Sequence, residues 1–384
     1  MNLAVAGGGT GGHIFAGVAI AQEFKSQSRA NDVLFVGSEY GLETRLVPKA
    51  GFRLETLKLG KLVGQNFLRK ILTLLQIPFA VLKCVRILRR NEIDLVIGVG
   101  GYAAGPCILA ARLLRIPTGV LEQNAVMGFT NRLSARLAGH VFTAFDEIPA
   151  GLPAAKCTFT GNPVRVGLRP EASKQARLNS PQVVGAQSDQ ARPFTVFAFG
   201  GSQGASGINR MMVEAAREFA GEKNTVRIIH QTGEREFDQV VAAYREMGFP
   251  AEVHRFIDDM QSMYDRASLV VCRAGSGTIA ELGATKNAAL FIPFPFAAQD
   301  HQARNAELIE RAGAGVMIPQ FRKDRDGAKV DTPGTELAAR IRALRDDLAT
   351  LARMRENIAA FSRPDAAHRI VELMKIHALK RRPA

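Results

Sequence analysis

The sequence predicts an α/β protein of two Rossmann-like domains, each a doubly wound parallel sheet, facing each other across a cleft. Short apolar runs alternate with helical patterns along most of the chain, which is typical of parallel sheets covered by helices. A strand, a glycine turn and a helix open the chain at "NLAVAGGGTGG" and recur about 190 residues later at "TVFAFGGSQGASGINRMMVEAA". The length of 384 residues fits two domains of about 150–200 residues better than a single core.

The first half reads as strands and helices in alternation. Strands are expected at 2–6, 33–37, 94–98, 118–122 and 156–160. Helices are expected near 15–27, 66–90, 105–114 and 129–138. Ligands of open α/β sheets bind outside the carboxyl ends of the strands, so the turns after these strands are where a site is expected.

The second half repeats the alternation after a polar stretch at roughly 170–193. Its first strand is "FTVFAF", and further strands are expected at 226–231, 252–256, 268–272, 288–292 and 314–318. Two such domains in tandem would present their strand ends opposite each other, with one ligand on each side of the cleft.

The composition, 47% hydrophobic and 22% charged, describes a folded globular protein. The opening "NLAVAG" enters a strand without the basic start or apolar core of a signal sequence, so no export is expected. The cysteines Cys84, Cys107, Cys157 and Cys272 are scattered and form no C-x-x-C motif. We interpret them as reduced packing residues of a cytosolic protein.

The net charge of +14 implies an acidic partner. Between residues 45 and 90, eleven lysines and arginines accompany a single acidic residue, Glu55. The longest uncharged run in this region, residues 71–82, has 12 residues and is too short to span a bilayer.

The helix expected at 66–90 is amphipathic beyond Pro78. The pattern predicts an apolar face of Leu82, Val85 and Leu88 and a cationic face with Lys83, Arg86 and Arg90. Such a helix suits the plane of an anionic membrane surface, and it equally suits an ordinary helix that covers a sheet. Nucleic acid is the less favoured partner, because no aromatic residues are interleaved with the charges.

The first glycine turn has the G-x-G-x-x-G spacing of a dinucleotide site at Gly7, Gly9 and Gly12. That site needs an acidic residue at the end of the second strand, but "VLFVGSEYG" has Gly37 there and an acid only two positions later. The sequence therefore favours NAD binding only weakly. The simpler interpretation is a tight turn that packs the helix on the sheet and binds no ligand. His13 follows the turn directly and is either a general base or a helix cap.

The second half offers three polar segments at helix starts. The turn at 200–204 leaves backbone N–H groups where a helix dipole favours phosphate. In "LVVCRAGSGTIAEL", Glu281 either forms a capping box with Thr278 or accepts the hydroxyls of a ribose. The segment "AAQDHQARNAEL" is either an inert helix start or a set of partners for sugar hydroxyls, namely Gln299, His301, Gln302 and Asn305.

Eight motifs together resemble the MurG family of bacterial wall-synthesis N-acetylglucosaminyltransferases. In order they are "GGGTGGHIFAG", "GVGGYAAGP", "EQNAVMGFTNR", "FTGNPVR", "FGGSQGA", "FIDDM", "CRAGSGTIAEL" and "DHQARNA". Each motif alone is weak, but eight in order, from the first strand to about Pro319, are highly specific. The resemblance implies a GT-B fold with domains at 1–163 and 164–362, and a last helix within 363–384 that returns to the first domain before a basic tail.

The implied reaction moves N-acetylglucosamine from its UDP donor to the muramoyl 4-hydroxyl of lipid I, giving lipid II. The α-linked donor becomes a β-linked product, so the resemblance implies one in-line displacement with inversion. It implies neither a metal nor another cofactor in the transfer step.

The resemblance places most of the donor site in the second half. There it implies the backbone of Ile257 for the uracil, Glu281 for the ribose and Gln302 for the sugar. For the diphosphate it implies Ser202, Ser276, Gly277 and Thr278. From the first half it implies Thr10, Gly11, Gly12 and Asn124 around the transferred sugar and Arg165 reaching the donor from the hinge.

The acceptor site and the membrane contact fall in the first half. The resemblance implies that the loops with Gly9, His13, Gly100, Gly101 and Tyr102 take the acceptor's pyrophosphate and sugar, with His13 as the base. Helix N-termini and an arginine would stabilise the charge of the leaving UDP without an ion. Because the acceptor is a polyprenyl lipid, the resemblance implies a peripheral protein on the cytoplasmic face of the bacterial membrane. The membrane residues would be Lys83, Arg86, Arg89 and Arg90, and cell-wall and division machinery are candidate partners.

Three positions depart from the family's pattern. Ala16 stands where proline is common, Leu121 where histidine precedes Glu122, and His301 where some members have glutamine. These changes bear on substrate tuning and leave the reaction's residues in place. Two alternatives stay open: a GT-B transferase acting on another lipid, such as diacylglycerol, and a nucleotide-sugar-binding protein without transferase activity. The "EQN" and "GGY" stretches argue against the former.

Overall fold

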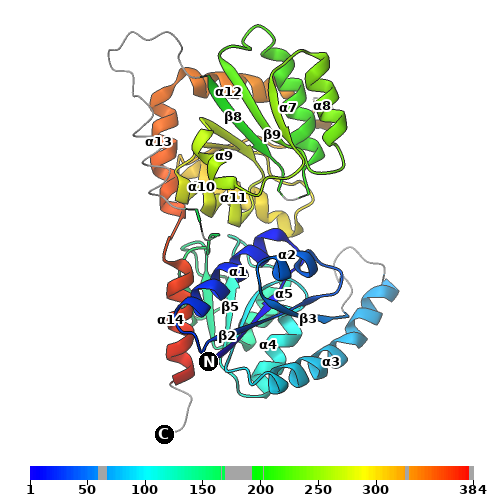
Figure 1. The fold of residues 1–384 in the computed structure, drawn as a ribbon, viewed down its shortest axis with the longest axis vertical. Coiled ribbons are helices and arrows are strands. Elements are labelled where there is room, and N and C mark those ends of the chain that lie inside the picture. Colours follow the sequence, from blue (N-terminus) through cyan, green and yellow to red (C-terminus); the bar gives the residue numbers. More distant parts are fainter. Residues whose placement is uncertain (59–66, 166, 169–192, 202, 325–327, 380–384) are drawn as a thin grey trace. The chain divides into compact units, whose positions relative to one another are not determined.

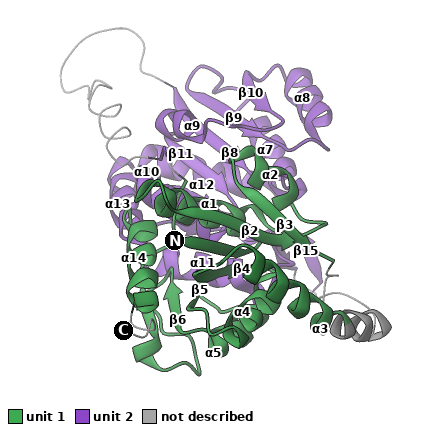
Figure 2. Cartoon of the chain, turned by 60° about the horizontal axis from the view of Figure 1, so that its bottom comes forward, with its two compact units in different colours: residues 1–166, 363–384 green, residues 167–362 purple. Residues whose placement is uncertain are grey.

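The structure is a computed structural model that describes residues 1–58, 67–165, 167–168, 193–201, 203–324 and 328–379. The chain divides into two compact units, one of residues 1–166 with 363–384 and one of residues 167–362 (Figure 2). Each unit contains its own parallel sheet with helices packed on it (Figure 1). These two doubly wound sheets confirm the predicted fold class.

The first unit is built on a parallel sheet of seven strands. In chain order the strands are β1 (Asn2–Gly7), β2 (Asp32–Ser38), β3 (Arg53–Leu57), β4 (Leu95–Gly100), β5 (Thr118–Glu122), β6 (His140–Thr143) and β7 (Cys157–Phe159). Their order across the sheet is β3-β2-β1-β4-β5-β6-β7, and all neighbours pair in parallel. The order changes direction between β1 and β4, and ligands of open α/β sheets bind at such a switch point.

Helices cover both faces of the first sheet. They are α1 (Gly11–Ser26), α2 (Glu43–Lys49), α3 (Phe67–Arg90), α4 (Ala104–Leu113), α5 (Phe129–Leu137) and α14 (Ala366–Leu379), with a short 3-10 turn η1 (Ala154–Lys156). On one face, Phe24 of α1 and Met374 of α14 are buried with Leu3 of β1. On the other face, Cys84 of α3 and Cys107 of α4 are buried in a second cluster.

The C-terminal helix α14 packs on the first unit beside α1 (Figure 1). Its Met374 lies against Gly119 of β5, where an added Cβ would stand 2.6 Å from the Met374 sulfur. Its last turn brings Nε2 of His377 within 3.1 Å of Nδ1 of His140 in β6. The first unit therefore depends on a segment that is far away in the sequence.

The second unit is built on a parallel sheet of six strands and a small antiparallel hairpin. The sheet strands are β8 (Phe194–Phe199), β9 (Val226–Gln231), β10 (Ala251–His254), β11 (Leu269–Cys272), β12 (Ala289–Phe291) and β13 (Val316–Met317), and the hairpin strands are β14 (Phe321–Lys323) and β15 (Lys329–Asp331). The sheet order is β10-β9-β8-β11-β12-β13, so a second switch point lies between β8 and β11.

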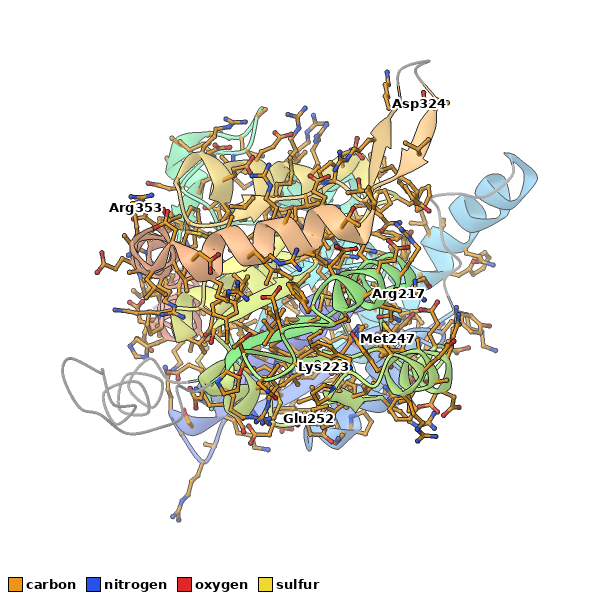
Figure 3. The ribbon with its side chains drawn as sticks, turned by 90° about the horizontal axis from the view of Figure 1, so that it is seen from above. Arg217, Lys223, Met247, Glu252, Asp324 and Arg353 are labelled. Carbon is orange, nitrogen blue, oxygen red and sulfur yellow. The ribbon has the colours of Figure 1, made fainter. Side chains whose placement is uncertain are left out.

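The helices of the second unit follow its strands. They are α7 (Ser206–Glu218), α8 (Phe237–Glu246), α9 (Met260–Arg266), α10 (Ser276–Thr285), α11 (His301–Arg311), α12 (Gly334–Asp346) and α13 (Leu348–Ile358), with 3-10 turns η2 (Ala298–Asp300) and η3 (Ala359–Phe361). Figure 3 shows Lys223 and Met247 near each other, and Nζ of Lys223 donates to the Met247 carbonyl at 3.2 Å. That bond ties the segment after α7 to the end of α8.

Strands that the sequence pattern missed are short or polar. β3 reads "RLETL" at the edge of its sheet, β6 has four residues, and β14 and β15 have three each. Such strands carry too few apolar positions to show a period. Helix α1 also begins at Gly11, four residues before the predicted start, because glycines with low helix propensity concealed its first turn.

The predicted apolar face of α3 is confirmed for Val85 and Leu88, which cover the sheet, and is wrong for Leu82. Leu88 is fully buried and Val85 is half-buried, and both pack with Cys84 toward the sheet, whereas Leu82 is 55% exposed. The three predicted positions span about 120° of a helix with 3.6 residues per turn, so they do not share one direction. Leu82 shares the exposed surface of the described part of α3 with Phe79.

The cations of α3 lie on its exposed surface. Lys83, Arg86, Arg89 and Arg90 are all exposed, and Arg90 forms an ion pair with Glu55 of β3. Within the part of the chain that the structure describes, no helix combines the length and the apolar character needed to cross a membrane.

The histidine pair between β6 and α14 predicts acid sensitivity of the first unit. His140 is buried between His377 and the Thr158 hydroxyl, which lies 2.8 Å from its Nε2. Burial, and then the neighbouring His377 and Lys156, lower the pKa of His140 from 6.5 to about 4. The folded unit therefore binds fewer protons here than the unfolded chain, and stability present above pH 6.5 is lost as the pH falls toward 4.

We expect the melting temperature of the first unit, measured by differential scanning calorimetry, to fall between pH 7 and pH 4.5. The His140→Gln variant should show a smaller fall, because glutamine carries no proton to bind. His301→Gln, in the second unit, is the control and should behave as the wild type does. An equal fall in all three proteins would contradict the assignment to His140.

Candidate active site

The first switch point is bordered by two glycine turns that touch. The Gly8 amide donates to the Gly100 carbonyl at 3.1 Å, and an added Cβ on Gly101 would stand 2.5 Å from the Gly8 carbonyl oxygen. Gly9, Gly100 and Gly101 have backbone φ angles of +83°, +105° and +86°, which residues other than glycine rarely adopt. The turn residues Gly9 and Thr10 are exposed. Glycine is therefore needed here for close backbone contact as well as for the turn itself.

His13 lies on the first turn of α1 and reaches back to the glycine turn. Its Nδ1 is 3.1 Å from the Gly8 carbonyl oxygen. Because a carbonyl only accepts, this contact selects the tautomer with hydrogen on Nδ1 and leaves Nε2 as the basic nitrogen. The imidazole packs on Gly100, where an added Cβ would stand 2.7 Å from Nε2. The structure thus brings together the predicted His13, Gly9, Gly100 and Gly101.

A buried carboxylate that sequence reasoning missed closes the same turn. Glu43, 1% exposed at the start of α2, accepts the Gly9 amide through Oε2 and the Ser38 amide through Oε1, both at 2.8 Å. The Gly9 amide of the G-x-G-x-x-G turn is therefore already bound to an anionic side chain. This contact argues against a pyrophosphate at that amide, whether it belongs to a dinucleotide or to the acceptor. It therefore argues against a dinucleotide site, and it leaves Gly9 to line the predicted acceptor site without its amide.

A second buried carboxylate organises the segment that carries Asn124. Glu122 ends β5 and is 2% exposed. Its Oε1 accepts the Asn124 amide at 2.9 Å, and its Oε2 accepts Nδ2 of Asn131 at 3.0 Å and the Gly128 amide at 3.3 Å. Burial raises the pKa of Glu122, while these hydrogen bonds oppose that rise. The sequence signal for this role is an acid that ends a buried apolar strand.

Other predicted first-half residues lie around the start of α1. The Arg165 guanidinium stands 4.3 Å from the centre of the Phe15 ring, and the residue belongs to the first unit. Gln123 donates to the Val99 carbonyl at 3.2 Å, and an added Cβ on Gly12 would be 3.8 Å from its Oε1. Tyr102 is half-buried after β4. β1, β4 and β5 are neighbours, so the segments after them share one sheet edge.

In the second unit a glutamine side chain, not a glutamate, holds the segments after the strands together. Gln231, at the end of β9, donates to the Gly201 carbonyl at 2.9 Å and accepts the Ile257 amide at 2.8 Å. It thereby joins the glycine turn after β8 to the segment after β10. A ligand would take the Ile257 amide only by displacing Gln231. Ser202 lies outside the described residues.

The helix α10 starts at the second switch point, directly after β11. Gly275 is its N-cap, and Ser276, Gly277 and Thr278 form its first turn, whose amides favour an anion. Thr278 lies inside the helix, so the capping box proposed for Thr278 and Glu281 is not formed. Glu281 is instead 6% exposed and accepts the Tyr264 hydroxyl at 2.8 Å.

The loop after β12 carries the remaining predicted residues. Oε1 of Gln302 accepts the Phe294 amide at 2.9 Å, and Nδ1 of His301 lies 2.8 Å from the Ala298 carbonyl oxygen. Asn305 is fully buried and donates to the Ala274 carbonyl at 3.0 Å. Asn305 therefore holds the segment before α10 in place, while Gln302 and His301 stay near the surface.

Both halves match models of one family. Residues 3–143 match the glycosyltransferase family 28 N-terminal domain, and residues 195–370 match the glycosyltransferase family 28 C-terminal domain. Two similar proteins are named UDP-N-acetylglucosamine–N-acetylmuramyl-(pentapeptide) pyrophosphoryl-undecaprenol N-acetylglucosamine transferase. The one from Myxococcus xanthus is 42% identical over 97% of this chain and 92% of its own length. The one from Geobacter sulfurreducens is 42% identical over 97% of this chain and 98% of its own length.

Solved structures agree with the sequence matches. The crystal structure of Acinetobacter baumannii MurG superposes with a TM-score of 0.76 at 29% identity, covering 98% of this chain and 99% of that one. A UDP-N-acetylglucosamine 2-epimerase from Neisseria meningitidis reaches a TM-score of 0.64 at 13% identity, over 99% of this chain and 100% of its own. At that identity the likeness concerns the fold alone.

Proposed function

Because this chain belongs to glycosyltransferase family 28, we propose that it transfers N-acetylglucosamine from UDP-N-acetylglucosamine to the muramoyl 4-hydroxyl of undecaprenyl-pyrophosphoryl-muramoyl-pentapeptide. The product of this lipid I to lipid II step is the disaccharide-linked lipid of peptidoglycan synthesis. The observation that carries the assignment is the 42% identity, over 97% of the chain, to transferases named for this reaction. The protein is an N-acetylglucosaminyltransferase.

We assign the acceptor to the switch point of the first unit. His13 lies there on the first turn of α1, beside the exposed residues Gly9 and Thr10, and its Nδ1 is 3.1 Å from the Gly8 carbonyl oxygen. In the proposed step, Nε2 of His13 takes the proton of the 4-hydroxyl while its oxygen attacks the anomeric carbon. Gly9, Gly100, Gly101 and Tyr102 surround the acceptor, and general-base help of this kind contributes about 10²–10⁴ in rate.

We assign the nucleotide of the donor to the switch point of the second unit. The first turn of α10 provides amides at a helix N-terminus for the diphosphate, and Glu281 provides a carboxylate for the ribose hydroxyls. Ser202 and Ile257 complete the proposed nucleotide contacts, and Gln302 contacts the sugar. Thr10, Gly11, Gly12, Asn124 and Arg165 are the proposed donor contacts of the first unit.

The chemistry balances without a redox partner. The acceptor oxygen forms a bond to the anomeric carbon as the bond to the UDP oxygen breaks, and that oxygen leaves with the electron pair. The α-helix dipole at α10 stabilises the developing negative charge. We propose that the step needs no metal, and activity retained in EDTA would support this.

The described surface of α3 supports a peripheral membrane contact. Phe79 and Leu82 are 73% and 55% exposed, and the cations Lys83 and Arg86 follow them on the helix. Exposed apolar side chains beside cations suit the boundary of an anionic bilayer. We propose that this surface holds the enzyme at its lipid-linked acceptor on the cytoplasmic face of the membrane.

Transfer of radiolabel from UDP-N-acetylglucosamine to a short-chain lipid I analogue, with and without EDTA, tests the function. The wild type should transfer the label, and His13→Ala should lower kcat by about 10²–10⁴ while donor binding persists, because the base is lost. A wild type that binds the donor without turnover would instead indicate a non-catalytic binder.

The ribose assignment predicts weaker donor binding in Glu281→Ala. Loss of a charged hydrogen-bonding partner should cost about 1–3 kcal/mol in binding of UDP-N-acetylglucosamine, measured by isothermal titration calorimetry. Glu246→Ala, on the exposed surface of α8, is the matched control. Unchanged donor affinity in a folded Glu281→Ala protein would contradict the ribose assignment and leave Glu281 with a structural role as the hydrogen-bond partner of Tyr264.

The membrane surface predicts a loss of vesicle binding when its cations are removed. Serine at Lys83, Arg86, Arg89 and Arg90 together should weaken binding to vesicles with anionic lipid by about 1 kcal/mol per cation in a flotation assay. Serine at four exposed arginines of the second unit, Arg217, Arg245, Arg340 and Arg353, changes the net charge equally. Equal losses in both variants would contradict a local membrane face.

A further inference from the structure

One peptide group links Glu43 to His13. The carbonyl of Gly8 and the amide of Gly9 belong to the same peptide unit. Its N–H donates to Oε2 of Glu43 at 2.8 Å, and its oxygen lies 3.1 Å from Nδ1 of His13. The carboxylate and the imidazole are thus joined by two hydrogen bonds through a single planar, polarisable group.

The direction of both bonds favours a more basic imidazole. A carboxylate that accepts the N–H draws the peptide hydrogen toward itself and increases the negative charge on the carbonyl oxygen. That oxygen then accepts the Nδ1 hydrogen more strongly, since hydrogen bonds in a chain polarise one another. The chain of bonds holds the Nδ1-protonated tautomer and stabilises the positive ring that forms when Nε2 takes a proton.

The surroundings of Glu43 are built to hold this carboxylate. An added Cβ on Gly8, Gly37 or Gly41 would stand 2.3, 2.6 or 1.9 Å from atoms of the Glu43 side chain. Gly37 and Gly41 do not have a positive φ, so conformational freedom does not explain them. Because these glycines have no side chain, the Glu43 side chain fits into the space that a Cβ atom would fill. The Ser38 amide fixes the second oxygen, Oε1, at 2.8 Å.

We propose that Glu43 is a positioning residue for His13, acting through the Gly8–Gly9 peptide to orient the imidazole and raise its basicity. The inference rests on the proposed function, in which Nε2 of His13 accepts the proton of the 4-hydroxyl. Glu43 itself transfers no proton and touches no substrate. It does for His13 what a directly bonded carboxylate does for other histidine bases, with a peptide group in between.

Other charged groups near the start of α1 have different partners. Glu122, at the end of β5, is engaged by Asn124, Gly128 and Asn131. Arg165 lies over the Phe15 ring. From α14, His368 pairs with Glu23 at the opposite end of α1. Among these described groups, Glu43 is the one that a hydrogen-bonded peptide connects to the His13 ring.

The experiment compares the wild type with Glu43→Gln, and with Glu39→Gln as a matched control on the same segment. In the full-length protein labelled with ¹⁵N-histidine, ring spectra across pH report the tautomer and titration of His13, which is assigned by its absence in His13→Ala. We expect an Nδ1-protonated ring in the wild type and titration at lower pH in Glu43→Gln, with Glu39→Gln unchanged. The loss of the negative charge makes the imidazolium less stable, which lowers the pKa of His13.

Kinetics with the lipid I analogue provide a second measurement. We expect Glu43→Gln to lower kcat by about 10- to 100-fold, to move the acid limb of its pH profile to lower pH, and to keep donor affinity. Glu43→Asp, which retains the charge, should recover part of the loss. Identical His13 titration in Glu43→Gln and wild type overturns the inference. A wild type without transferase activity defeats the proposed function alone, because the ring titration still tests the link between Glu43 and His13.

Discussion

The change of strand order in each parallel sheet is the constraint on which the rest of this structure depends. Where the connections on either side of a strand run in opposite directions, the adjacent strand ends are left uncovered. In the first unit these are the ends of β1 and β4, and in the second unit those of β8 and β11. Each is followed by a glycine turn or by the start of a helix. The proposed acceptor and nucleotide sites lie at these positions, where open α/β sheets bind their ligands.

Buried glutamates keep these polar edges in order. Glu43, Glu122 and Glu281 are 1%, 2% and 6% exposed. Glu43 and Glu122 accept amides of the segments that follow β1 and β5, and Glu281 accepts the hydroxyl of Tyr264 in α9. Burial of a carboxylate is costly unless donors surround it, so each glutamate fixes the segment that supplies those donors. A loop that binds a substrate would otherwise sample many conformations. Glu43 and Glu122 therefore hold the segments after β1 and β5 in a fixed conformation, and Glu281 links α10 to α9.

Gln231 serves the same purpose in the second unit without a charge. Its amide donates to the turn after β8 and accepts from Ile257, so one side chain joins two segments of the edge. A neutral amide suits this position, because one partner is a carbonyl and the other an N–H, which a carboxylate could not satisfy together. The choice between glutamate and glutamine in the two units follows from the donors and acceptors each must serve.

The sequence by itself determined the two-domain α/β class, the glycine turns and the family. These features depend on local pattern and on the order of motifs, which survive without knowledge of contacts. Only the tertiary structure decided that α1 begins at Gly11, that Leu88 of α3 faces inward, and that Asn305 is a structural tie rather than a surface amide. It also decided that Glu43, 30 positions after His13, belongs to the same site. No spacing rule reveals such a pairing, because it arises when β1, β2 and α2 pack together and one glycine peptide comes within hydrogen-bonding reach of both side chains.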